Sequence, residues 1–169
     1  MLFLVLLASI VLWSILNGMP LINNLRAKWE AYRLQAQWEK PYREDTYGGK
    51  TPEETYDMFL AALSKGDTTL ASKYFVIEKQ DNWDKTLGEY KNNSLLASFT
   101  KELEDTRKIW KKSEKSTENL VSFTYINTVS KDKTVDFEGQ KITIPSGNYI
   151  NETMFEINTY TKIWKISVL

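Results

Sequence analysis

The chain has 169 residues, of which 42% are hydrophobic and 26% charged, which suits a single domain with an appendage. Lys and Arg total 22 and Asp and Glu total 22, so no basic field attracts phosphate backbones, and we expect no nucleic-acid partner. The absence of Cys and His excludes disulfides, thiolate and imidazole catalysis and the common zinc sites. We therefore predict no cofactor and no metal site, and no residue can be assigned as catalytic.

The first residues, MLFLVLLASIVLWSIL, carry no charge, and the apolar character continues to Ile22. A helix from Leu2 to Ile22 would be about 31 Å long, close to the thickness of a bilayer's hydrocarbon core. The run ends in Leu-Asn-Gly-Met-Pro, which is a poor cleavage site, so we favour an uncleaved membrane anchor over residues 1–22 to a secretory signal peptide. Membrane-interface positions are predicted for Trp13, Trp29 and Tyr32.

Residues 23–50 are predicted to form a juxtamembrane amphipathic helix and a linker. Apolar residues recur at spacings of three and four, namely at Ile22, Leu25, Trp29, Tyr32 and Ala36. This seam suits either a short coiled-coil stalk, and hence self-association, or packing on the membrane or on the domain. The segment KPYREDTYGGK, residues 40–50, has no apolar period and is predicted to be the linker.

The stretch TPEETYDMFLAALSKGD opens the predicted domain, residues 51–169. Thr51 suits a helix N-cap, and Glu54 three residues later completes a capping box. An apolar stripe follows on one helix face, made of Tyr56, Phe59, Leu60 and Leu63. Gly66 should end this helix in a left-handed conformation, and Asp67 should cap a second helix with an apolar face of Leu70, Ala71, Tyr74 and Phe75.

A third helical region is predicted from about residue 82, with a break at Asn92-Asn93. Beyond residue 105 the apolar residues alternate, which predicts strands around residues 121–129, 142–144, 155–157 and 164–168 and an edge strand at 108–112. The order of elements predicts an α+β domain in which three helices pack on one face of a curved antiparallel sheet of four to six strands.

The residues from Thr51 to Phe75 follow the pattern T-P-E-E-x-x-x-x-F-L-x-A-L-x-x-G-D-x-x-x-A-x-x-Y-F. This pattern resembles the opening of the cystatin-like cone fold named after nuclear transport factor two, in particular the small membrane-anchored bacterial proteins of that superfamily. A tetratricopeptide repeat reads similarly, but no second copy follows at a period of about 34 residues. The resemblance implies a conical pocket between helices and sheet and a domain outside the cytoplasm. Orientation is contested, because Arg26, Lys28 and Arg33 follow the anchor and the positive-inside rule favours a cytoplasmic domain.

The candidate pocket residues are the large aromatics expected near the cone interior, Tyr74, Trp110, Tyr125, Phe155 and Trp164. They could line a ligand pocket, or they could simply fill the core. Three hypotheses follow for the function. The first is a membrane-anchored, extracytoplasmic, non-catalytic module that binds an unknown protein or small molecule. The others are a small-molecule enzyme of the isomerase or cyclase kind, using a pocket carboxylate and a Tyr, and a structural subunit assembling through its N-terminal helix.

Overall fold

The computed structural model describes residues 2–137 and 140–169, and it describes side chains outside residues 2–8, 10–12, 14–21, 135–137 and 140. The chain forms two compact units, Met1–Glu44 and Asp45–Leu169. The helices are α1 (Leu2–Glu44), α2 (Pro52–Ser64), α3 (Thr68–Ser72), the 3₁₀ turn η1 (Ile77–Lys79), α4 (Gln80–Asn92) and α5 (Leu96–Lys108). The strands are β1 (Lys111–Lys112), β2 (Leu120–Val129), β3 (Lys133–Phe137), β4 (Gln140–Ile144), β5 (Gly147–Ile157) and β6 (Trp164–Val168).

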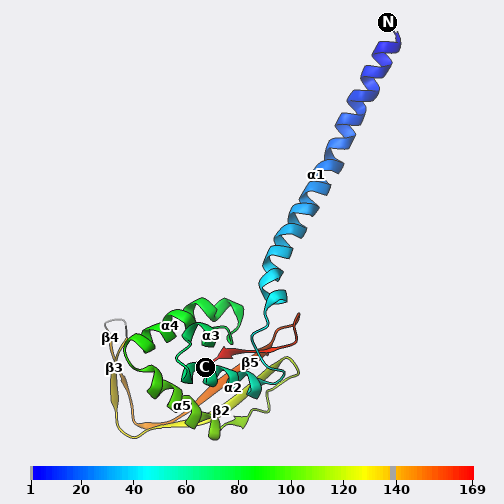
Figure 1. The fold of residues 1–169 in the computed structure, drawn as a ribbon. Coiled ribbons are helices and arrows are strands. Elements are labelled where there is room, and N and C mark those ends of the chain that lie inside the picture. The colour runs from blue at the N-terminus through cyan, green and yellow to red at the C-terminus, as the bar shows by residue number, and fades with distance from the viewer. Residues whose placement is uncertain (1, 138–139) are drawn as a thin grey trace. The chain divides into compact units, whose positions relative to one another are not determined.

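The first unit consists of α1, a single helix of 43 residues (Figure 1). Its predicted seam is exposed where side chains are described, and Trp29 and Tyr32 make an edge-to-face contact at 6.4 Å between ring centroids. A search of the described residues finds no helix with the length and apolarity needed to cross a membrane. Most side chains of the predicted anchor, residues 1–22, lie outside the described ones.

The predicted cap of α2 is present. Thr51 Oγ1 accepts a hydrogen bond from the Glu54 amide at 3.1 Å. The Glu54 carboxylate, however, accepts from the amide of Lys50 at 2.7 Å, so the reciprocal bond of the capping box is shifted by one residue. Pro52 occupies the first turn, where its missing N–H costs no hydrogen bond.

The predicted stop after α2 and the start of α3 are confirmed. Gly66 has φ of +68°, the left-handed conformation that glycine adopts without steric cost. Asp67 Oδ1 then accepts from the Leu70 amide at 2.9 Å and caps α3. The second helix is shorter than predicted, because α3 ends at Ser72 and Tyr74 lies in the connection that follows.

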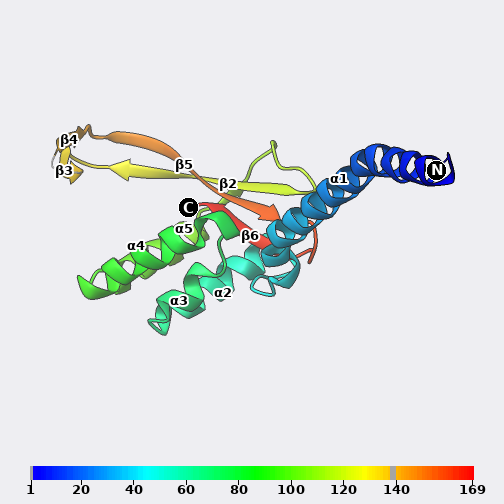
Figure 2. The same ribbon diagram turned by 90° about the horizontal axis from the view of Figure 1, so that it is seen from above.

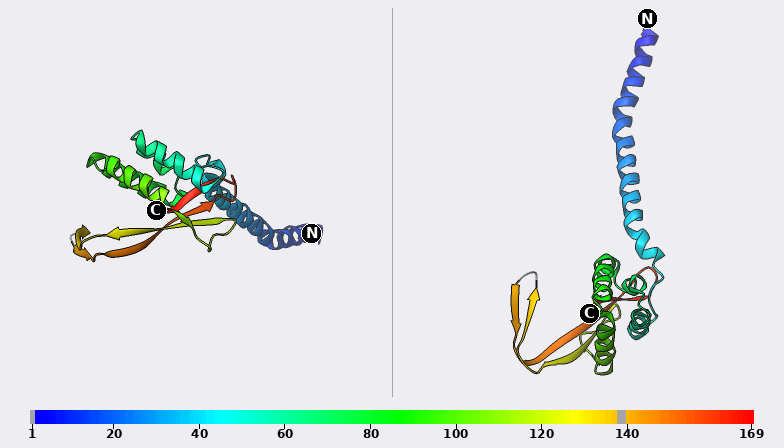
Figure 3. Two further views of the ribbon diagram at one scale, coloured as in Figure 1. Left: turned by 90° about the horizontal axis from the view of Figure 1, so that it is seen from below. Right: turned by 60° about the vertical axis from the view of Figure 1, so that its left-hand side comes forward.

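The second unit is an α+β domain, as predicted at that level. Its sheet is antiparallel with strand order β1-β2-β5-β6. Figures 2 and 3 show α2 to α5 gathered on one side of this sheet. Side chains of Val121, Phe123 and Phe155 alternate toward the helices and are buried, because one face of each strand meets the helical layer.

The strands β3 and β4 form a separate two-stranded hairpin beyond the ends of β2 and β5 (Figure 1). The alternation at Ile142 and Ile144 correctly predicted a strand, and β4 pairs in the order expected for a hairpin. Ile142 is 44% exposed, and this hairpin has none of the helices α2 to α5 packed over it (Figure 3).

Two sequence-based boundaries differ from the structure. The helix α1 continues to Glu44 and includes part of the segment predicted to be a linker, and the second unit already begins at Asp45. The prediction of a strand over residues 108–112 is wrong for its first half, because α5 extends to Lys108 and β1 contains only Lys111 and Lys112. The basic residues at 107 and 108 suit the C-terminal end of a helix dipole, which favours the helix there.

Candidate functional site

An aromatic cluster fills the space between the helices and the sheet. Trp110 stacks on Phe123 at 4.7 Å between centroids and contacts Tyr56 at 4.4 Å. Phe155 contacts Trp110 and Phe123, both at 5.9 Å. Each pair lies within the separation at which aromatic rings attract one another. The part of the interior that Trp110 and Phe155 were predicted to offer to a ligand is therefore occupied by protein.

The five predicted pocket residues do not form one site. Trp110 and Phe155 come together in the aromatic cluster, whereas Tyr74 and Trp164 are buried in the core and do not line the groove described below. Burial raises the pKa of Tyr74, with a smaller contribution in the same direction from Asp67. Of the five, Tyr125 lines an open groove.

This groove lies between α5 and the end of the sheet, and its volume is about 560 Å³. The residues that line it from α5 and its end are Ser98, Lys101, Glu102, Asp105, Thr106 and Ile109, and those from the sheet are Tyr125, Ile126, Asn127 and Asn151. The α5 wall therefore carries polar, charged and apolar side chains, and the sheet wall carries polar and apolar ones. We call this feature the α5–β2 groove.

The Tyr125 hydroxyl is the most enclosed titratable group of the groove. Burial raises its pKa, a hydrogen bond with Asn151 acts in the opposite direction, and the nearby Glu102 raises it again. A phenol with a raised pKa stays protonated at neutral pH, so Tyr125 can donate a hydrogen bond. Glu102 itself is exposed, which does not favour a carboxylate held for proton transfer.

Among the side chains that the structure describes, no three acidic groups come close enough together to form a metal site. The α5–β2 groove offers hydrogen-bonding groups, charged side chains and apolar contact. This arrangement can bind and orient a ligand.

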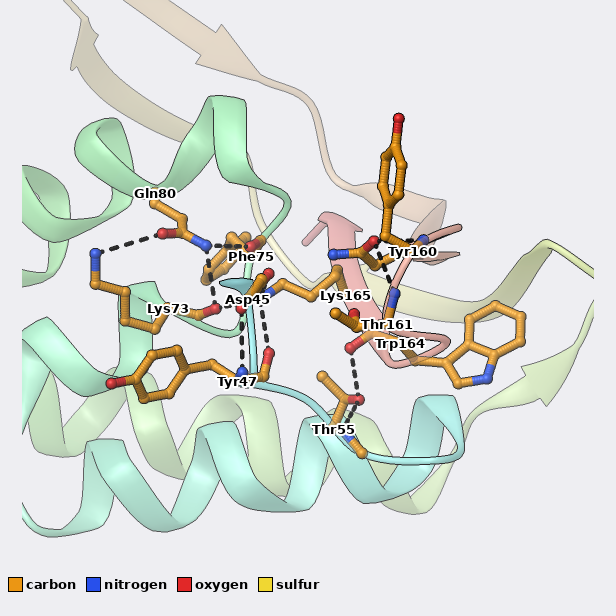
Figure 4. Close-up of polar contacts among 12 residues, drawn as sticks. Asp45, Tyr47, Thr55, Lys73, Phe75, Gln80, Tyr160, Thr161, Trp164 and Lys165 are labelled. Atoms are coloured by element: carbon orange, nitrogen blue, oxygen red, sulfur yellow. Dashed lines mark hydrogen bonds and ion pairs between the residues drawn. The ribbon is translucent and has the colours of Figure 1, made fainter. Parts of the chain in front are cut away.

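A second polar cluster is buried where the segment after α1 meets β6 (Figure 4). The Lys165 ammonium lies 2.7 Å from Asp45 Oδ2, and both side chains are almost fully buried, with 3% and 2% exposed. The ammonium also donates to the carbonyls of Tyr47 at 2.6 Å and Lys73 at 2.5 Å. Three acceptors match the three N–H donors of an ammonium. Burial lowers the pKa of Lys165, and the Asp45 carboxylate opposes that change.

The segment that follows α1 is fastened to the domain around this pair. The Gly49 carbonyl accepts from the Trp164 amide at 2.9 Å, and the Gly49 amide donates to Thr55 Oγ1 at the same distance. The Thr55 hydroxyl in turn donates to the Trp164 carbonyl, as Figure 4 shows. A Cβ on Gly48 would lie 2.4 Å from the Trp164 carbonyl oxygen, so only glycine fits there without a shift. Residues 45–50 are therefore part of the folded domain.

The sequence analysis did not single out Asp45 or Lys165. Asp45 lies in a polar stretch that predicts a linker, and the pattern of β6 places Lys165 on the face opposite Trp164 and Ile166, where a lysine is normally solvated. The one sequence feature that could have indicated a buried Lys165 is its position between apolar neighbours on the last strand. Its partner cannot be predicted from local pattern, because contacts such as that with Tyr47 span 118 residues.

The predicted membrane-interface residues lie on α1, whereas the candidate pocket residues belong to the second unit. Trp13, Trp29 and Tyr32 each expose about two thirds of their side chains.

Comparisons with protein-family models, with curated proteins and with solved structures found no match to this chain.

Proposed function

We propose that this chain is a membrane-anchored, extracytoplasmic interaction module that binds a partner without transforming it. The observation that carries the proposal is the division of the interior, in which aromatic side chains fill the space behind Tyr56 and Trp110 while an open groove remains at the end of the sheet. The region that these aromatic rings fill leaves no enclosed space in which a substrate could be desolvated. A solvated groove suits recognition.

The membrane part of the proposal rests on the sequence. The apolar run through Ile22 is long enough to span a bilayer, and the exposed aromatics Trp29 and Tyr32 suit the interface next to it. Placement outside the cytoplasm, and the finer description of the domain as a cystatin-like cone, rest on the resemblance of residues 51–75. The arrangement of four helices on one face of the sheet is compatible with such a cone.

The enzyme hypothesis requires an enclosed carboxylate beside a tyrosine. The best match in the described residues is Glu102 near Tyr125, and Glu102 is open to solvent. The Asp45 carboxylate is buried, but it is paired with Lys165 and does not line the groove with Tyr125. Binding is therefore the function that this geometry supports best.

The experiment is fractionation combined with protease accessibility in cells that express the full chain with a C-terminal tag. We expect the tag in the membrane fraction, where it should resist extraction with alkaline carbonate. We also expect protease to digest the tag when it is added to cells whose outer membrane or cell wall has been permeabilised while the cytoplasmic membrane stays intact. A cytoplasmic protein of known location serves as the control for lysis. Recovery of the tag in the soluble fraction, or its protection while the lysis control is intact, would disprove the proposed placement.

A further inference from the structure

The sheet has one protected edge and one open edge. On the outer side of β6, the Ile166 amide donates to the Tyr74 carbonyl at 2.9 Å and the Val76 amide donates to the Ile166 carbonyl at 3.0 Å. The Gly49 carbonyl covers the same edge at Trp164. The backbone of residues 49 and 74–76 therefore caps β6, in the way that natural sheets avoid unwanted strand pairing.

The opposite edge is covered over only part of its length. The strand β1 begins at Lys111 and pairs with β2 through Lys111 opposite Thr124 and Lys112 opposite Phe123. The chain before β1 belongs to α5 and its C-terminal end, so on this edge no described strand lies beside β2 beyond Thr124. Continuation of the register would place residues 109 and 107 opposite Ile126 and Thr128, but these residues lie at the end of the helix.

The direction of the backbone groups follows from the ladder. The Ser122 carbonyl accepts from the Ser113 amide at 2.8 Å, so even-numbered residues of β2 turn their N–H and C=O groups toward the outer edge. Odd-numbered residues, such as Tyr125 opposite Asn151, turn theirs toward β5. The backbone groups of Ile126 and Thr128 consequently point into the open edge and have no strand partner in the described parts of the chain.

The open edge borders the α5–β2 groove. Ile126 and Asn127 line this groove from the strand, and Ile109 lines it from the end of α5. The open section, Ile126-Asn127-Thr128-Val129, contains no Lys, Pro or inward charge of the kind that blocks edge pairing. On the other wall, Lys101 and Glu102 are opposite in sign, and Asp105 is paired with Lys108 at 2.7 Å. The groove therefore favours neither a strongly acidic nor a strongly basic occupant.

We propose that the α5–β2 groove binds an extended polypeptide segment of a partner protein, which adds as a strand to the free edge of β2 and carries little net charge. This inference rests on the proposed function as an interaction module and names the partner's chemistry. Only a polypeptide backbone offers alternating donors and acceptors in the register that Ile126 and Thr128 present. The added strand continues the line of β1, and α5 forms the second wall against its side chains.

The test uses the full chain in detergent micelles and a random peptide library as the probe. Peptides enriched on the chain are synthesised, and amide hydrogen exchange is measured by NMR with and without them. In the free protein, the amides of Ile126 and Thr128 should exchange at least about tenfold faster than those of Tyr125 and Asn127, which bond to β5. With peptide bound, the exchange of the Ile126 and Thr128 amides should slow by a similar factor.

Two variants separate the backbone from the side chain. Ile126→Pro removes the outward N–H and leaves the bonds to β5, whereas Ile126→Thr keeps the N–H and a β-branched side chain. We expect peptide affinity to fall at least about tenfold in the first and to change little in the second. Urea unfolding identifies a proline variant that fails to fold, and in that case the exchange data on the unchanged protein decide.

The proposal is overturned if the library yields no binder, or if bound peptides leave the exchange of the Ile126 and Thr128 amides unchanged. It is also overturned if these amides become protected with rising protein concentration in the absence of peptide, because the occupant is then a second copy of this chain. Each of these results can occur while the tag remains membrane-bound and accessible to protease, so failure of strand addition is distinguishable from failure of the proposed placement.

Discussion

The buried pair of Asp45 and Lys165 should contribute far more to stability than its distance alone suggests. Replacing Lys165 by Met leaves the Asp45 carboxylate buried without its counter-ion and removes the donor from two backbone carbonyls. Breaking a buried pair in this way costs about 3–5 kcal/mol. For a domain of this size, that cost corresponds to a fall in Tm of about 10–20 °C.

A thermodynamic cycle tests the origin of this cost. Asp45→Asn alone should also destabilise, because it leaves the ammonium buried beside carbonyls only. The double variant Lys165→Met with Asp45→Asn holds no buried charge, so its loss should be smaller than the sum of the single losses by about 0.5–3 kcal/mol. Unfolding of the full chain in urea, followed by circular dichroism, measures all four proteins under the same conditions.

The chain supplies a matched control in the exposed pair of Asp105 and Lys108. Its nitrogen and oxygen are also 2.7 Å apart, but the two side chains are 57% and 71% exposed. Solvent screens such a pair, so Lys108→Met should leave the urea midpoint unchanged within error. Equal effects of Lys108→Met and Lys165→Met would refute the reasoning, since the larger cost is assigned to the burial of the Lys165 ammonium and to its bonds with two backbone carbonyls.

Three further predictions concern other positions. Gly48→Ala should lower the free energy of unfolding in urea, because its Cβ would meet the Trp164 carbonyl oxygen at 2.4 Å. Gly88→Ala, whose Cβ would have nothing within 4 Å, should raise the same free energy by about 0.5–1 kcal/mol. Thr51→Ala removes the cap of α2 and should cost about 1 kcal/mol in the same assay. Burial raises the pKa of Tyr56, so the folded state keeps a proton that the unfolded chain releases above about pH 10. The stability that depends on Tyr56 is complete below that pH and is lost above it. Tyr56→Phe should flatten the decline above about pH 10 by up to about 1.4 kcal/mol per pH unit, and an unchanged slope would contradict this assignment.

Local signals predicted the helical half of the domain well. Thr51, Gly66 and Asp67 each act through neighbours within a few residues, so their roles follow from sequence spacing. The alternation in β2 and β5 likewise fixes which side chains face the helices. The break at Asn92-Asn93 is confirmed by the end of α4.

Non-local contacts escaped prediction for a physical reason. The sequence of residues 45–50 looks like a linker, because the contacts that hold this segment in place come from β6, more than a hundred residues later. The free edge of β2 escaped as well, since a strand's pattern gives its faces but not the length of its neighbour. Only the short pairing of β1, two residues long, creates the opening beside Ile126.

The attachment of residues 45–50 to β6 also determines how a mechanical load would enter the domain. A pull transmitted along the chain from α1 reaches the domain at Asp45, where the ion pair passes it to Lys165 and the Gly49 carbonyl passes it to Trp164. These contacts lead into the sheet itself, upstream of the cap that starts α2. If α1 is held in place, tension on this protein is therefore borne by β6 before it can unwind the helical layer.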